Sequence, residues 1–261
     1  MKIALASMDQ LWGNKEGNFR SCVELAKCAK NYGAEVIIFP ELTLTGYFLD
    51  SELIGEPLDD SHTLLKFGEL AKELMCTVVF GACLIDRNDS MARNFFCVAQ
   101  PDGSSEAIYA KIHTFSHAGE DQVIASGTQV KTFKVSEVTF GASVCYDLRF
   151  PALYASMSND SDCGVVIANW PHSRKDHWFA LMKARAIENQ MYMIGVNRVG
   201  KDGNEISYSM TSCVVSPYGD FEAPIFIEGA ISLFEIDTRV VDQYRKSFPT
   251  LRDRRLDIDV F

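Results

Sequence analysis

The sequence contains no apolar run long enough to cross a membrane, and it has no excess of basic residues. A spanning helix needs about 20 mostly apolar residues, whereas the apolar start, MKIALASM, soon gives way to polar residues. We therefore predict a first strand over residues 2–8 in place of a signal peptide, and a cytoplasmic protein with no membrane partner. The formal net charge of -10 also predicts no nucleic-acid partner, because phosphate binding needs a basic face.

The spacing patterns of disulfide frameworks and metal sites are missing too. None of the eight cysteines forms a CxxC pair, and a chain of 261 residues can bury a sizeable core without disulfides. The histidine pairs at 113 and 117 and at 172 and 177 do not belong to an HExxH motif. We therefore expect no metal and no organic cofactor, and we interpret most cysteines as small buried side chains in a reducing compartment.

The chain is not divided by a proline-rich linker, a low-complexity tract or a block of charge, so we expect one domain over residues 1–261. Apolar residues at helical spacing predict helices over 15–32, 62–75 and 174–190, with Gly33 ending the first and Ser173 capping the last. Short apolar runs bounded by turn residues predict strands over 35–41, 76–84, 94–103, 139–147, 164–171, 191–200, 212–220 and 230–237. The pattern alone predicts an α/β or α+β domain whose sheets pack face to face with helices outside.

Reactive side chains stand where three apolar strands end. Glu41 follows EVIIFP, and a carboxylate beside buried surface can accept a proton near neutral pH. Lys111 follows AIYA, and Cys145 ends TFGASVC at a strand-to-helix elbow of the kind that lifts a side chain into a pocket. Each residue alone is equally compatible with an ordinary surface or core position. A thiol needs a neighbouring base or cation to become a nucleophile, and Glu41 and Lys111 are suited to these two roles. A papain-like Cys–His site is the rival interpretation of Cys145.

Three segments in this order, FPELTLTGY, YAKIHTF and GASVCYDLRFP, resemble the catalytic blocks of the carbon–nitrogen hydrolase (nitrilase-like) family. The resemblance implies a four-layer αββα sandwich in which Cys145 is the nucleophile and Glu41 the general base. It implies that Lys111, together with the main-chain N–H of Tyr146, stabilises the oxyanion, and that Glu120 is a fourth catalytic residue. It further implies a homodimer, with residues 238–261 forming a C-terminal tail that contacts the partner.

The segment ANWPHSRKDHWFALMKARAIENQMYMIGVNRVGKDGN is similar to the omega-amidase branch of that family. This similarity implies a small-molecule substrate, a dicarboxylate monoamide such as 2-oxoglutaramate. Arg149 then either binds the distal carboxylate or forms a structural ion pair with Asp147. The expected walls of the substrate pocket are Tyr47, Phe115 and Trp170. The alternatives are an aliphatic amidase or N-carbamoyl amidohydrolase of the same family and, from a different class, a non-catalytic binding subunit.

Overall fold

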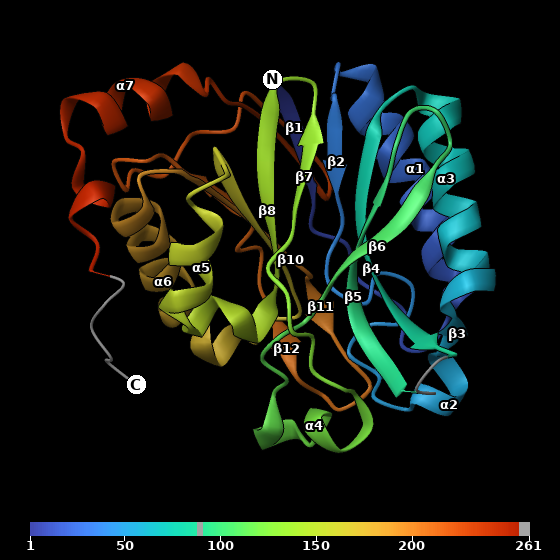
Figure 1. Cartoon of the computed structure of the whole chain (residues 1–261). Coiled ribbons are helices and arrows are strands. Elements are labelled where there is room, and N and C mark those ends of the chain that lie inside the picture. The colour runs from blue at the N-terminus through green and yellow to red at the C-terminus, as the bar shows by residue number, and fades with distance from the viewer. Residues whose placement is uncertain (88–90, 256–261) are drawn as a thin grey trace.

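Two stacked β-sheets lie between two pairs of helices in the computed structural model, which describes residues 1–87 and 91–255 (Figure 1). The larger sheet has the order β14 (Phe226–Glu228), β15 (Ile231–Glu235), β1 (Lys2–Ala6), β2 (Val36–Ile38), β4 (Thr77–Asp86), β5 (Met91–Ala99) and β6 (Ser105–Ala110), and β3 (Glu56–Pro57) pairs with β4. The smaller sheet has the order β13 (Cys213–Val215), β10 (Tyr192–Asn197), β9 (Cys163–Ala168), β8 (Val138–Val144) and β7 (Thr132–Val135). A short pair, β11 (Gly200–Lys201) and β12 (Ser207–Tyr208), stands apart from both.

Apolar side chains fill all three spaces between the four layers. Helices α1 (Lys15–Asn31) and α3 (His62–Leu74) cover the outer face of the larger sheet, and α5 (Pro151–Met157) and α6 (Lys175–Asn189) cover the outer face of the smaller one (Figure 1). The inner faces of both sheets share one apolar core. Central strands such as β2 and β9 are therefore buried on both sides, which is why their sequences are apolar at successive positions. The predicted αββα sandwich is confirmed.

The helix ends follow from local sequence in two cases and depart from prediction in a third. Ser61 caps α3 by accepting a hydrogen bond from the main chain of Leu64 at 3.1 Å. Gly33, just beyond the end of α1, has a φ of +86°, a conformation that suits glycine. The prediction that Ser173 caps the third long helix is wrong. A 3-10 turn, η4 (His172–Arg174), comes first, and α6 begins only at Lys175.

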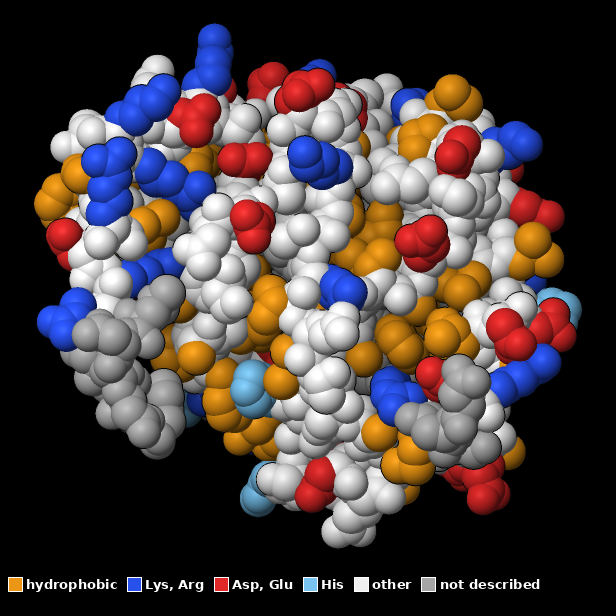
Figure 2. Space-filling view, in the orientation of Figure 1, with side chains coloured by type: hydrophobic (Ala, Val, Ile, Leu, Met, Phe, Trp, Pro, Cys, Tyr) orange, Lys and Arg blue, Asp and Glu red, His pale blue; other side chains and the backbone are white. Residues whose placement is uncertain are grey.

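The C-terminal region folds onto its own chain as far as it is described. It forms α7 (Arg239–Ser247) and a 3-10 turn, η5 (Thr250–Asp253), and basic side chains gather over this region (Figure 2). Arg245 donates to the main-chain oxygens of Ser158 and Asn189, at the ends of α5 and α6, so a cation meets the negative ends of both helices. The predicted contact of this tail with a partner subunit is untested, and residues 256–261 lie outside the described residues.

Four short elements complete the described chain. They are α2 (Ser51–Ile54), η1 (Leu58–Asp60), η2 (Ser116–Ala118) and α4 (Glu120–Val123). Within residues 1–87 and 91–255, no helix is both long enough and apolar enough to cross a membrane.

Candidate active site

The carboxyl ends of strands from both sheets meet at one edge of the sandwich. Strands β1, β2 and β4 run parallel in the larger sheet, and β8, β9 and β10 run parallel in the smaller one. Strand β6 is antiparallel to β5, which is antiparallel to β4, so β6 points the same way as β4. Glu41, Lys111 and Cys145 follow β2, β6 and β8, and the fold therefore brings them together as predicted. Ligands commonly bind at such carboxyl ends of parallel strands.

Cys145 stands at the elbow between β8 and a 3-10 turn, η3 (Cys145–Arg149). Its φ of +47° lies in the left-handed region, which non-glycine residues adopt only when their surroundings hold them there. The thiol donates to the main-chain oxygen of Asn169, 3.9 Å away. Burial, followed by the negative charge of Glu41, raises the pKa of Cys145 well above its ordinary value. The thiol is therefore protonated at rest and needs a base during attack.

The buried carboxylate of Asp147 holds this elbow in place. It accepts hydrogen bonds from the main chain of Val144 at 3.0 Å and from the hydroxyl of Tyr109 at 2.7 Å. It also accepts from the main chain of His113 at 2.9 Å and lies 2.8 Å from the ring Nδ1 of the same residue. Asp147 thus ties the nucleophile elbow to the segment that follows Lys111, and Arg149 does not pair with it.

Glu41 is fully buried in a turn that depends on close packing against β4. A side chain at Gly81 would place its Cβ 2.4 Å from the main-chain nitrogen of Leu42, so only glycine lets this turn approach the strand. One carboxylate oxygen of Glu41 accepts from Asn94 Nδ2 at 2.8 Å and from Lys111 Nζ at 3.0 Å. The other accepts from the main-chain nitrogen of Asn169 at 2.9 Å. The same peptide segment thus contacts both the carboxylate and the thiol of Cys145.

Lys111 is fully buried between two carboxylates. Its Nζ lies 3.0 Å from Glu41 Oε1 and 2.8 Å from Glu120 Oε2. Burial alone would lower the pKa of Lys111, but the charges of Glu41 and Glu120 outweigh it and raise this pKa well above its ordinary value. For Glu120, burial acts upward, but Lys111 and the main-chain N–H of Phe115 leave its pKa lowered. The lysine is therefore a fixed cation beside the thiol.

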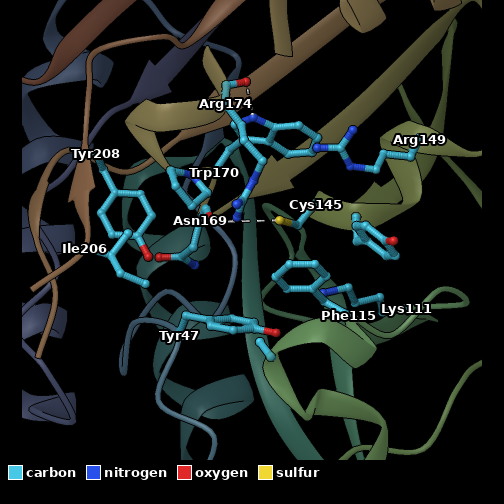
Figure 3. Close-up of a pocket in the computed structure, with 13 residues that line it drawn as sticks. Tyr47, Lys111, Phe115, Cys145, Arg149, Asn169, Trp170, Arg174, Ile206 and Tyr208 are labelled. Carbon is cyan, nitrogen blue, oxygen red and sulfur yellow. Dashed lines mark hydrogen bonds between the residues drawn. The ribbon is translucent and has the colours of Figure 1, made fainter. Parts of the chain in front are cut away.

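A cleft opens above Cys145, and it is lined by all five residues that we predicted to bind substrate (Figure 3). It encloses about 520 Å³ including the space at its mouth, a size suited to a small molecule. The predicted lining residues are Tyr47, Phe115, Tyr146, Arg149 and Trp170. The guanidinium of Arg149 lies 4.7 Å from the ring centroid of Trp170, so it is held by an aromatic face and not by a carboxylate.

Sequence reasoning missed other residues of this site. Asn94 on β5 donates to Glu41 and, at 3.1 Å, to Glu120, and Arg174, Ile206 and Tyr208 line the cleft. The segment 206–210 comes from the short β11–β12 pair, whose sequence carries little apolar pattern. Arg174 was signalled only by its place in the ANWPHSR segment. Among residues 1–87 and 91–255, no cluster of three or more His, Cys, Asp or Glu side chains is arranged to hold a metal ion.

Comparisons with known proteins agree with this geometry. The model of the carbon–nitrogen hydrolase family matches residues 2–246, and the chain therefore belongs to this family of enzymes that act on amides. It is 31% identical to the omega-amidase YafV of Escherichia coli, over 97% of this chain and 96% of that protein. It is 34% identical to the 2-oxoglutaramate amidase of Paenarthrobacter nicotinovorans, over 86% and 80% of the two chains. A crystal structure of a family member from Xanthomonas campestris, with an arsenic adduct in its active site, superposes with a TM-score of 0.90 at 26% identity and covers 99% of this chain and 98% of that one.

Proposed function

We propose that the protein is an omega-amidase that hydrolyses the terminal amide of a small dicarboxylate monoamide, such as 2-oxoglutaramate, to a carboxylate and ammonia. The observation that carries this proposal is the buried Glu41–Lys111–Glu120 cluster beside Cys145, at the base of a cleft that also holds arginine. Relatives named as omega-amidase and 2-oxoglutaramate amidase support the substrate class.

The first half of the reaction forms a thioester. Glu41 takes the proton of the Cys145 thiol while the sulfur attacks the amide carbon. The ammonium of Lys111 and the main-chain N–H of Tyr146 stabilise the oxyanion, and each such donor typically contributes about 3–4 kcal/mol to lowering the barrier. Glu41 then protonates the leaving nitrogen, the carbon–nitrogen bond breaks, and ammonia departs. Glu120 keeps Lys111 charged and oriented.

Water completes the cycle. Glu41 accepts a proton from a water molecule, the resulting hydroxide attacks the thioester carbon, and the carbon–sulfur bond breaks. The proton returns to the sulfur, so the enzyme is regenerated and the second product is a carboxylic acid. Arg149 binds the distal carboxylate of the substrate in this scheme. Tyr47, Phe115 and Trp170 form the walls around its short chain.

Further parts of the proposal concern assembly and location. We expect a homodimer formed through α5, α6 and the C-terminal tail, to be measured by light scattering on the full chain. All eight cysteines are unpaired, which supports a reducing compartment such as the cytoplasm.

The test is ammonia release from 2-oxoglutaramate, succinamate, propionamide and N-carbamoylputrescine, by wild type and by Cys145→Ala. We expect wild type to prefer the first two substrates and the variant to lose activity on all of them. Activity confined to propionamide or N-carbamoylputrescine would keep the mechanism and reject the substrate class. No activity on any of the four would favour a non-catalytic binding subunit.

A further inference from the structure

A second arginine reaches the cleft, and the mechanism above gives it no role. The half-buried side chain of Arg174 points inward toward Cys145 and Asn169, whereas that of Arg149 lies against Trp170 (Figure 3). The main chain of Arg174 is fixed, because its carbonyl oxygen accepts a hydrogen bond from the indole of Trp170 at 2.8 Å. Its guanidinium lies 5.6 Å from the ring centroid of Phe115. The position of this cation is therefore determined by the cleft itself.

Neither cleft arginine meets a protein carboxylate within the described residues. Arg149 contacts only aromatic rings and, at 3.4 Å, the ring of His177, and Arg174 contacts only Phe115. By contrast, Arg185, Arg198 and Arg239 elsewhere in the chain each form an ion pair. A partly desolvated guanidinium without an anion leaves its hydrogen-bond donors free for a ligand.

The charges at the base of the cleft sharpen this point. Lys111 is already offset by Glu41 and Glu120, so the two guanidinium groups make the outer part of the cleft positive in a chain whose formal net charge is -10. The proposed substrate has one distal carboxylate, which one arginine can bind with both carboxylate oxygens. Once its amide carbonyl faces Cys145 and its carboxylate faces Arg149, the remaining acceptor is the oxygen on carbon 2.

We propose that Arg174 is a specificity-determining residue that donates hydrogen bonds to the 2-oxo oxygen of the substrate. This inference rests on the proposed function and names the substrate class more closely. The cleft selects monoamides of 2-oxo dicarboxylic acids over monoamides that lack the oxygen. It also rejects monoamides with a 2-amino group, because an ammonium there would face the guanidinium. A hydrogen bond from a charged donor predicts a preference of roughly 10- to 100-fold for the 2-oxo compound.

The experiment compares kcat/KM for 2-oxoglutaramate, the monoamide of glutaric acid and L-glutamine, which differ only at carbon 2. The enzymes are wild type, Arg174→Gln, Arg174→Lys and the control Lys175→Gln, which removes an exposed like charge one residue along the chain. In Arg174→Gln we expect the ratio of the first substrate to the second to fall roughly 10- to 100-fold, and the gap to L-glutamine to narrow. Arg174→Lys keeps the charge without the planar fork, so it should lose part of the preference but still reject L-glutamine. The control should keep both ratios.

The outcomes separate the two proposals. If wild type hydrolyses these monoamides but Arg174→Gln slows the first two equally, Arg174 does not read carbon 2 and this inference is wrong. If Arg174→Gln does not fold, as judged by circular dichroism, the Arg174→Lys ratio decides, and an unchanged ratio with that variant overturns the inference. If wild type hydrolyses none of the three, the proposed function itself is wrong.

Discussion

Asp147→Asn is the substitution that most directly tests how the nucleophile elbow is held. The carboxylate of Asp147 meets two main-chain N–H groups, those of Val144 and His113, one at each oxygen. An amide of the same shape keeps one oxygen and replaces the other with an NH2 group. Whichever way it turns, one buried main-chain N–H faces another donor. Tyr109 can rotate its hydroxyl and His113 can change tautomer, but a main-chain N–H has no such freedom.

The expected cost follows from these contacts. An unsatisfied buried donor costs about 1–3 kcal/mol, and the remaining bonds weaken because they lose the charge of the acceptor. We expect the free energy of unfolding to fall by about 3 kcal/mol, which corresponds to a melting temperature roughly 6–12 °C lower. The strained backbone of Cys145 is also released, and a misplaced nucleophile typically costs about 100-fold in rate.

The assay is urea denaturation together with ammonia release, with Asp160→Asn as a control that removes an exposed carboxylate. The control should match wild type in both measurements. A variant of Asp147 whose free energy of unfolding stays within about 0.5 kcal/mol of wild type would refute the count of unsatisfied donors. A variant that loses stability but keeps its full kcat would refute the link between Asp147 and the geometry of Cys145.

Further predictions concern charge and pH. Glu120→Gln removes one of the two carboxylates bonded to Lys111, so kcat should fall about 100-fold with a smaller change in KM, and a change in KM alone would contradict this role. Burial and Glu41 hold the pKa of Cys145 high, so alkylation by iodoacetamide should be slow at pH 7 and accelerate above pH 8, whereas a rate already maximal at pH 7 would indicate a preformed thiolate. Against the effect of burial, Lys15, Ser61 and Thr63 lower the pKa of Glu56 from 4.5 to about 2. Its stabilisation, about 3 kcal/mol, is therefore present above pH 4.5 and lost as the pH falls toward 2, and Glu56→Gln should flatten this acid limb of a stability–pH curve.

The sequence predicted the long helices and the central strands because burial on one or both faces imposes a clear apolar pattern. It failed at elements that are short or edge-bound. Strand β14 pairs on one side only, and β11 and β12 are two residues each, so none of them carries a pattern that can be read. The error at Ser173 has a similar origin. A residue with good capping chemistry precedes the helix, but a 3-10 turn follows it and moves the start to Lys175.

The site divides in the same way. Glu41, Lys111 and Cys145 could be found because each follows an apolar strand and stands in a motif with a recognisable neighbourhood. Asn94 could not, because it lies inside a strand, and its importance depends on two carboxylates that are 53 and 26 residues away in the chain. Arg149 was left between two roles in the sequence, and the structure shows that Asp147 is bonded to other groups.

The catalytic cluster is shared between two sheets, and this has a consequence for folding. Glu41 and Lys111 follow strands of the larger sheet, whereas Cys145 and Asn169 follow strands of the smaller one. Neither half contains a working set, so enzymatic activity exists only after the two sheets have docked in register. Contacts between residues so distant in the chain form late and slowly. The return of activity during refolding therefore reports on sheet docking, a step that circular dichroism, which follows secondary structure, does not resolve.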